Sequence, residues 1–190
     1  MKIEVRKKMN QANVPEYMFF TKGIGRHKEK LQAFELALED AGISQFNLVE
    51  VSSIMPPECK IISKQEGLKK IRAGQILHCV LARNDSNEAN RLMTAAVGLA
   101  VPAEKKQYGY ISEHHTFGQT NKEASEYAED LAASMLAATL GIKTNQDKSF
   151  KERKMVHKLS GKIVKSNSIC QSAVGKKGLW TCVVASTVLI

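Results

Sequence analysis

The sequence lacks the patterns that identify several common classes of protein. Its four cysteines are never spaced as C-x-x-C, and no tight group of cysteine and histidine suggests a zinc site. No apolar run approaches the length of a membrane-spanning helix, and the charged start MKIEVRKKMNQA has no apolar stretch typical of a secretory signal. We therefore predict a cytoplasmic protein with free thiols, no metal and no membrane association.

The length and composition fit one ordinary globular unit. A chain of 190 residues is long enough for one substantial hydrophobic core and short for two domains. Apolar residues make up 43% and charged residues 25%, and no internal repeat or low-complexity linker is present. We therefore predict that residues 1–190 form a single domain.

Positive charge is concentrated in one region of the chain. The net charge is +9, and residues 143–177 contain only Asp147 and Glu152 as acidic residues. The basic residues there are Lys143, Lys148, Lys151, Arg153, Lys154, Lys158, Lys162, Lys165, Lys176 and Lys177. Such a region could attract nucleic-acid phosphates, but Phe150 is its only aromatic residue for base stacking. We interpret it as a solvated, lysine-rich surface and keep a nucleic-acid-binding module as the alternative.

Hydrophobic periodicity predicts strands interrupted by two helices. Strands are predicted over residues 16–21, 46–51, 75–82, 94–101, 107–113, 168–174 and 179–190. Helical spacing predicts one helix over residues 31–41 that ends at Gly42, and another that follows a capping box over residues 120–123 and ends at Gly141. The glycines in residues 22–28 predict a loop. This order of elements favours one compact α/β or α+β domain.

Two adjacent serines, Ser52 and Ser53, follow the strand predicted over residues 46–51. A Ser-Ser pair is common in turns, but the surroundings here indicate a reaction. Asn47 carries an amide that could polarise a backbone carbonyl, and the stiff segment 55–57 (Met-Pro-Pro) follows the pair. A peptide bond held in a strained turn suits self-cleavage. In that reaction the Ser53 hydroxyl attacks the Ser52 carbonyl, the amide becomes an ester, and elimination splits the chain and leaves a pyruvoyl group at residue 53.

The stretch NLVEVSSIMPPE resembles the processing site of pyruvoyl-dependent arginine decarboxylases. The similarity extends to LQAFELALEDAGI, AAVGLAVPAEKKQYGYISE and TNKEASEYAEDLAASM, and so covers most of residues 15–140. It implies an α+β fold, a sandwich of two sheets flanked by helices in an αββα arrangement. It also implies cleavage into a small chain, residues 1–52, and a large chain, residues 53–190. Members of the family assemble as trimers or pairs of trimers, with the active site between subunits.

The resemblance also assigns roles to residues of this chain. Ser53 is the precursor of the pyruvoyl group, whose ketone would form a Schiff base with the substrate amine and take up electrons as CO₂ departs. Ser52 becomes the carboxyl end of the small chain. Asn47 matches a residue that helps processing and substrate positioning. No metal and no added cofactor are needed.

Glu113 matches the family carboxylate that returns a proton to the α-carbon after CO₂ leaves. An ordinary glutamate has a pKa of about 4.3, too low for an acid at neutral pH. Desolvation at the end of a buried strand would raise that pKa and keep the proton available. The alternative is an ordinary strand-end carboxylate that pairs with His114 or with a lysine.

Glu35 stands where the family usually has the aspartate that contacts the guanidinium group of arginine. Its charge is kept and its side chain is one methylene longer, so a bidentate pair with a guanidinium remains possible in a shorter pocket. L-arginine is therefore the predicted substrate, and ornithine, lysine and histidine stay open. Glu35 could also be no more than a surface residue of its helix.

Two functions of different classes follow. The first is a self-processing lyase that decarboxylates arginine to agmatine, in polyamine supply or acid resistance, because the reaction consumes a proton. The second is an uncleaved nucleic-acid-binding module of the same fold that uses residues 143–177. Cleavage of the chain distinguishes the two.

Overall fold

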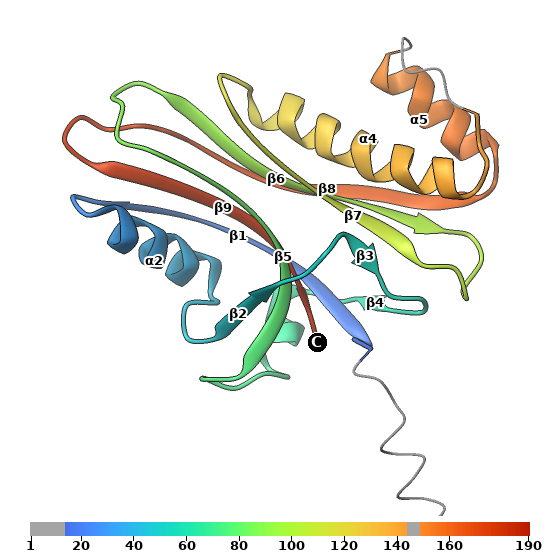
Figure 1. Cartoon of the computed structure of the whole chain (residues 1–190), viewed down its shortest axis with the longest axis horizontal. Coiled ribbons are helices and arrows are strands. Elements are labelled where there is room, and N and C mark those ends of the chain that lie inside the picture. Colours follow the sequence, from blue (N-terminus) through green and yellow to red (C-terminus); the bar gives the residue numbers. More distant parts are fainter. Residues whose placement is uncertain (1–13, 144–148) are drawn as a thin grey trace, which may run out of the picture.

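The computed structural model describes residues 14–143 and 149–190, which form two β-sheets with helices on their outer faces (Figure 1). Sheet A has the strand order β2 (Asn47–Glu50), β5 (Ile76–Ser86), β9 (Trp180–Leu189), β1 (Tyr17–His27) and β4 (Lys60–Ile61). Sheet B has the order β3 (Ile54–Met55), β7 (Gly109–Phe117), β6 (Leu92–Pro102) and β8 (Ile163–Val174). The long central strands of both sheets are antiparallel, whereas the short strands β2 and β4 pair in parallel.

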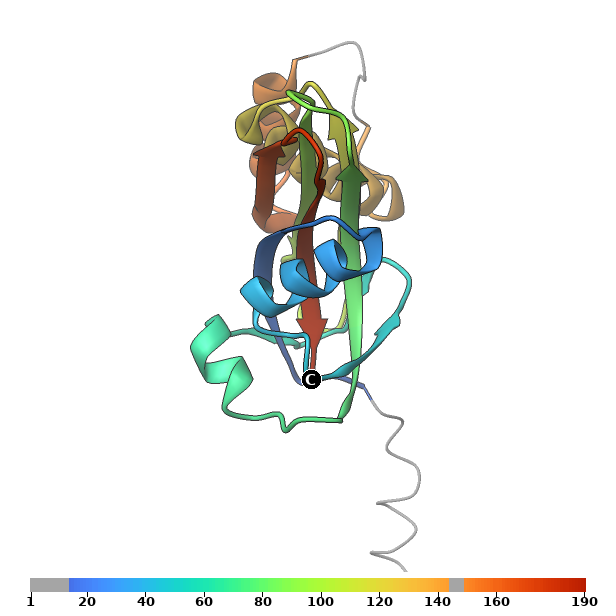
Figure 2. The ribbon, with the colours of Figure 1, turned by 90° about the vertical axis from the view of Figure 1, so that its left-hand side faces the viewer.

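The sheets lie between two helices, so the fold has four layers (Figure 1), and Figure 2 shows the blue helix over residues 30–41 in front of the strands of sheet A. Met18, Val97, Ile111 and Val183 belong to the apolar core between the two sheets. Helix α2 (Lys30–Ala41) packs on the outer face of sheet A. Helix α4 (Asn121–Thr139) packs on the outer face of sheet B through a row of buried alanines. The predicted α+β sandwich of the αββα type is confirmed.

The loop predicted over residues 22–28 is wrong, because β1 continues as a strand to His27. The glycines there allow α2 to lie close to the sheet. A Cβ atom on Gly23 would lie 2.1 Å from the carbonyl oxygen of Ala37, and one on Gly25 would lie 2.1 Å from that of Ala33. Gly23 and Gly25 therefore allow the backbone of α2 to approach the strand closely and do not break the strand.

The predicted helix ends are confirmed. Thr120 and Glu123 form a reciprocal capping box at the start of α4. Gly42 and Gly141 follow α2 and α4 with φ angles of 75° and 66°, values that glycine adopts without strain. Two helices were not predicted: α3 (Lys64–Leu68), which is very short, and α5 (Phe150–Leu159), which is rich in charge. Strands β5 and β7 extend beyond their predicted ends to Ser86 and Phe117.

Residues 47–61 pass between the two sheets. The chain runs from β2 at one edge of sheet A to β3 at an edge of sheet B, and returns to sheet A as β4 at its other edge. Figure 1 shows β2 crossing in front of β5 on its way to β3. This path brings the serine pair to the point where the chain leaves one sheet for the other. Within the described residues, no helix combines the length and the apolar character needed to cross a membrane.

Candidate active site

Ser52 and Ser53 form the junction between sheets A and B. The amide of Val51 still donates to the carbonyl oxygen of Cys79 on β5, at 2.9 Å. On the other side of the pair, the amide of Ile111 on β7 donates to the Ser53 carbonyl oxygen at 2.8 Å. The Ser52 carbonyl oxygen accepts from the amide of Ile54 at 2.8 Å, so Ser53 is the central residue of a γ-turn. The carbonyl groups on either side of the Ser53 α-carbon, those of Ser52 and of Ser53 itself, are therefore fixed by backbone hydrogen bonds.

The strain at the serine pair stays a prediction, and a rigid turn follows the pair. Glu58 and Asn90 are the non-glycine residues with positive φ among those described, and Glu58 has a φ of 62°. The amide of Cys59 donates to the Pro56 carbonyl oxygen at 3.3 Å, which closes a turn with Pro57 and Glu58 at its centre. Proline followed by a residue with positive φ is the pattern of a type II turn. The rigid proline turn therefore anchors the chain just downstream of the junction.

A cavity of about 460 Å³ lies beside Ser52. Its other lining residues are Val14, Pro15, Val51, Ile54, Pro56, Pro57, His78 and Leu189. The lining is mainly apolar, and Ser52 and His78 supply its polar side chains. A largely apolar cavity with few polar groups is the usual form of a small-molecule site.

Glu113 lies on β7, two residues after Ile111. Side chains alternate along a strand, so Glu113 projects from the same face as Ile111, which lies in the core between the sheets. Ser112 projects from the other face, where its hydroxyl donates to the Ala128 carbonyl oxygen of α4. Because Ile111 donates to Ser53, Glu113 is placed close to the junction.

The surroundings of Glu113 favour its protonated form. Loss of hydration raises the pKa of its carboxyl group, and the negative charge of Glu50 raises that pKa further. His115 on the same strand acts in the opposite direction. The side chain still reaches solvent, so it can exchange protons with water. A raised pKa is the direction of shift that a proton donor needs.

The same chain does not bring Asn47 or Glu35 to the junction. Asn47 begins β2 and its side-chain amide donates to the Gly74 carbonyl oxygen at 2.9 Å. Ser52 is five positions further along the chain, a span of about 16 Å if the chain is extended. Glu35 is exposed on α2, which covers the outer face of sheet A, away from sheet B. Of the predicted site residues, a single chain therefore assembles Ser52, Ser53 and Glu113.

Comparison with known proteins decides the family. The family model for pyruvoyl-dependent arginine decarboxylase matches residues 17–190. The chain belongs to this family. It is 57% identical over 177 residues to the probable pyruvoyl-dependent arginine decarboxylase of Chlorobaculum parvum, covering 93% of this chain and 98% of that protein. It is 55% identical over 178 residues to pyruvoyl-dependent arginine decarboxylase 2 of Methanosarcina acetivorans, covering 93% of this chain and 97% of that protein.

The basic region of this member of the family is partly neutralised within the described residues. Arg153 on α5 binds Asp130 on α4 at 2.6 Å, and Lys154 binds Glu129 at 2.6 Å. Lys162 donates to the Leu140 carbonyl oxygen at 3.0 Å. Lys148 of the predicted set lies outside the described residues. These contacts attach α5 and the start of β8 to α4, a structural role for several of the charges. The described residues contain no group of His, Cys, Asp and Glu side chains suited to a metal ion.

Two side chains near the junction were not identified from the sequence. His78 lines the cavity beside Ser52, and Glu50 lies close enough to Glu113 to shift its pKa. Both are placed by the parallel pairing of β2 with β5, in which Val49 is opposite His78 and Glu50 is opposite Cys79. No local pattern in the sequence encodes that pairing.

Proposed function

We propose that this protein cuts its own chain between Ser52 and Ser53 to generate a pyruvoyl group, and then decarboxylates L-arginine to agmatine and CO₂. Membership of the family and the printed names of its relatives support this assignment. The structural observation that carries it is the pair of backbone hydrogen bonds to the carbonyl groups on either side of Ser53. These bonds hold the Ser52 carbonyl group in one orientation next to Ser53, which favours attack by a neighbouring hydroxyl.

The cleavage uses groups that this chain supplies. The Ser53 hydroxyl attacks the Ser52 carbonyl carbon, an Oγ–C bond forms, the C–N bond breaks, and the hydroxyl proton passes to the nitrogen. The Ile54 amide, already bonded to the Ser52 oxygen, stabilises the negative charge that develops there. Loss of the Ser53 α-proton to a base then breaks the Cβ–Oγ bond and releases the Ser52 carboxylate. Tautomerisation and hydrolysis by one water molecule release ammonia and leave a ketone at residue 53.

The two products remain in one fold. The small chain, residues 1–52, contributes β1, α2 and β2, and the large chain, residues 53–190, contributes the other described strands and helices. Strand β1 pairs with β9 from Met18 to His27, and its residues Met18 and Phe19 are fully buried. Breaking one peptide bond leaves these contacts intact, so cleavage does not release the small chain.

The residues around Ser53 suit a cationic amino acid. The pyruvoyl group supplies a carbonyl that accepts the electrons of the breaking carbon–carbon bond. Glu113 holds the proton that replaces CO₂ on the α-carbon. Glu50 and the new Ser52 carboxylate bring negative charge close to the junction, which favours a positively charged substrate. Arginine is the proposed substrate. Because the Glu35 side chain is one methylene longer than the usual aspartate, ornithine, lysine and histidine are the alternative substrates.

The assembly is a homotrimer or a hexamer of cleaved protomers. In it, Glu35 and Asn47 reach the junction of a neighbouring copy, since neither reaches the junction of its own chain. We assign the protein to the cytoplasm and to the supply of polyamines, and we place no nucleic acid among its partners.

A denaturing mass spectrum of the purified protein tests the cleavage. The wild-type chain is expected to give two products with masses for residues 1–52 and 53–190, the larger one lighter than the plain hydrolysis product by one ammonia. Ser53→Ala is expected to stay intact, whereas Ser44→Ala, in the turn before β2, is expected to cleave normally. An intact wild-type chain would favour the nucleic-acid-binding alternative, which predicts binding that weakens steeply with salt.

A further inference from the structure

His78 is a polar side chain at the junction to which the proposed mechanism gives no task. Side chains alternate along β5, and its neighbours Leu77 and Cys79 belong to the core on the side of α2. His78 therefore projects from the opposite face of the strand, together with Val80, which lies in the core between the two sheets. On this face lies the cavity of about 460 Å³ whose lining includes both His78 and Ser52.

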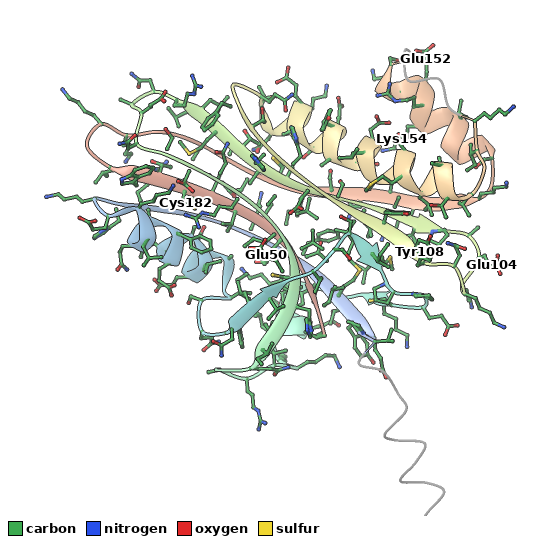
Figure 3. All side chains as sticks on the ribbon, in the orientation of Figure 1. Glu50, Glu104, Tyr108, Glu152, Lys154 and Cys182 are labelled. Carbon is green, nitrogen blue, oxygen red and sulfur yellow. The ribbon has the colours of Figure 1, made fainter. Side chains whose placement is uncertain are left out.

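Strand pairing fixes the backbone of His78 beside the cleavage point. In sheet A, His78 lies opposite Val49 on β2 and opposite Leu189 on β9, and Leu189 also lines the cavity. Strand β2 then ends at Glu50, which Figure 3 labels near the centre of the molecule, and the serine pair follows two positions later. The strand that carries His78 is therefore the neighbour of the strand that leads to Ser52.

The cavity borders Ser52 and not Ser53. Ser53 is absent from the cavity lining, and its carbonyl oxygen accepts from the Ile111 amide on β7, the strand that also carries Glu113. The residue that becomes the pyruvoyl group thus contacts sheet B, whereas the residue that becomes the new chain end borders the cavity. Among the described residues, the lining includes no acidic side chain, and His78 is its one basic side chain. Such a lining suits an anion better than a cationic substrate.

Cleavage produces an anion at this place. Before cleavage the Ser52 carbonyl carbon is bonded to the Ser53 nitrogen, and after elimination it belongs to a carboxylate at non-bonded distance, about 3.5 Å or more, from the pyruvoyl group. The amine of a substrate must also reach the ketone, so the carboxylate has to leave the space in front of it. A carboxylate that moves against apolar side chains needs a hydrogen-bond donor, because burial of an unpaired charge is costly.

We propose that the cavity receives the carboxyl end of the small chain after cleavage, and that His78 holds this end by a hydrogen bond from its imidazole ring to the Ser52 carboxylate. The inference rests on the proposed self-cleavage between Ser52 and Ser53. A neutral imidazole still carries one N–H donor, so the bond needs no protonated ring and the carboxylate keeps its negative charge. His78 is then a positioning residue, because it keeps the chain end away from the ketone and touches neither the ketone nor the substrate.

Trimming by a carboxypeptidase tests the position of the chain end without any turnover. The cleaved wild-type protein is treated with the protease, and the loss of Ser52 from the small chain is followed by mass spectrometry. His78→Leu, which has no donor, is expected to lose Ser52 about three- to tenfold faster, the range that one hydrogen bond supports. His78→Gln, which offers an amide N–H, is expected to restore most of the protection.

His27→Leu is the matched control, because it makes the same exchange far from the cavity. His27 lies opposite Trp180 in the pairing of β1 with β9, about 30 Å along the strand from Met18, which lies opposite Leu189. This variant is expected to be trimmed at the wild-type rate. Equal trimming of His78→Leu and the wild-type protein would overturn the inference.

Steady-state kinetics with arginine give the functional readout. An unanchored chain end competes with the substrate for the space in front of the ketone, so His78→Leu is expected to raise KM about three- to tenfold and to leave kcat unchanged. An unchanged KM would count against the inference. An intact wild-type chain in the denaturing mass spectrum would reject the proposed function and this inference together, whereas a cleaved chain whose end is trimmed equally with and without His78 would reject the inference alone.

Discussion

At the scale of single residues, the carboxyl group of Glu113 links the stability of the fold to its chemistry. Folding raises the pKa of this group through desolvation and through the charge of Glu50. The stabilisation that the protonated form provides is present at low pH and is lost as the pH rises through the raised pKa. Glu113→Gln is uncharged at every pH. Its melting temperature, relative to the wild-type protein, is therefore expected to rise from about pH 4 to about pH 8.

Glu113→Gln should lower the decarboxylase activity while it raises the relative stability at high pH. Glu113→Gln is expected to cleave normally and to lose about 10²- to 10⁴-fold in decarboxylation, since it cannot supply the proton. Glu123→Gln is the control: the Thr120 amide and hydroxyl donate to Glu123 and lower its pKa, so its replacement costs stability at neutral pH and spares activity. Normal turnover by Glu113→Gln would remove this residue from the mechanism.

At the scale of elements, α2 and α4 each pack on glycines of the strands beneath them, so that the backbones of helix and strand come close. A Cβ atom on Gly98 of β6 would lie 2.1 Å from the Ala128 carbonyl oxygen of α4. Backbone cannot move aside as a flexible side chain can. Gly98→Ala is therefore expected to lower the free energy of unfolding by about 1–3 kcal/mol, measured by urea denaturation. Val174→Ala, exposed at the end of β8, should change it by less than about 1 kcal/mol. Equal effects of the two changes would contradict this account of the packing.

The elements also show which features a sequence can predict. The capping box of α4 and the glycine after α2 were predicted correctly because their signals lie within a few residues. The loop predicted over residues 22–28 was wrong because Gly23 and Gly25 make room for helix α2, which packs on the strand. This contact belongs to the tertiary structure, and local sequence patterns do not show it. The serine pair was recognisable as a motif. The position of Glu50 was not, because it depends on the pairing of β2 with β5, two strands that are far apart in the sequence.

At the scale of the whole molecule, one chain does not bring all of the predicted site residues together. Ser52, Ser53 and Glu113 meet at the junction between the sheets, whereas Asn47 lies at the other end of β2. Glu35 lies on the outer face of the sandwich. Exposed apolar side chains, Val49, Ile54 and Ile76, lie on β2, β3 and β5 near the edges of both sheets. A neighbouring copy could cover them and add the missing polar groups.

Mixing two inactive variants distinguishes a shared site from a site within one chain. Ser53→Ala lacks the precursor of the pyruvoyl group but keeps Asn47, and Asn47→Ala keeps the precursor Ser53 but lacks the amide. If each site takes residue 53 from one copy and Asn47 from the next, random mixing in a ring rebuilds about one quarter of the sites. Co-expressed variants are therefore expected to show about that fraction of wild-type activity, while each variant alone stays inactive. Ser53→Ala mixed with Glu113→Gln is the control. Because Glu113 meets Ser53 within one chain, that mixture should regain no activity, and recovery there instead would reverse the assignment of residues to subunits.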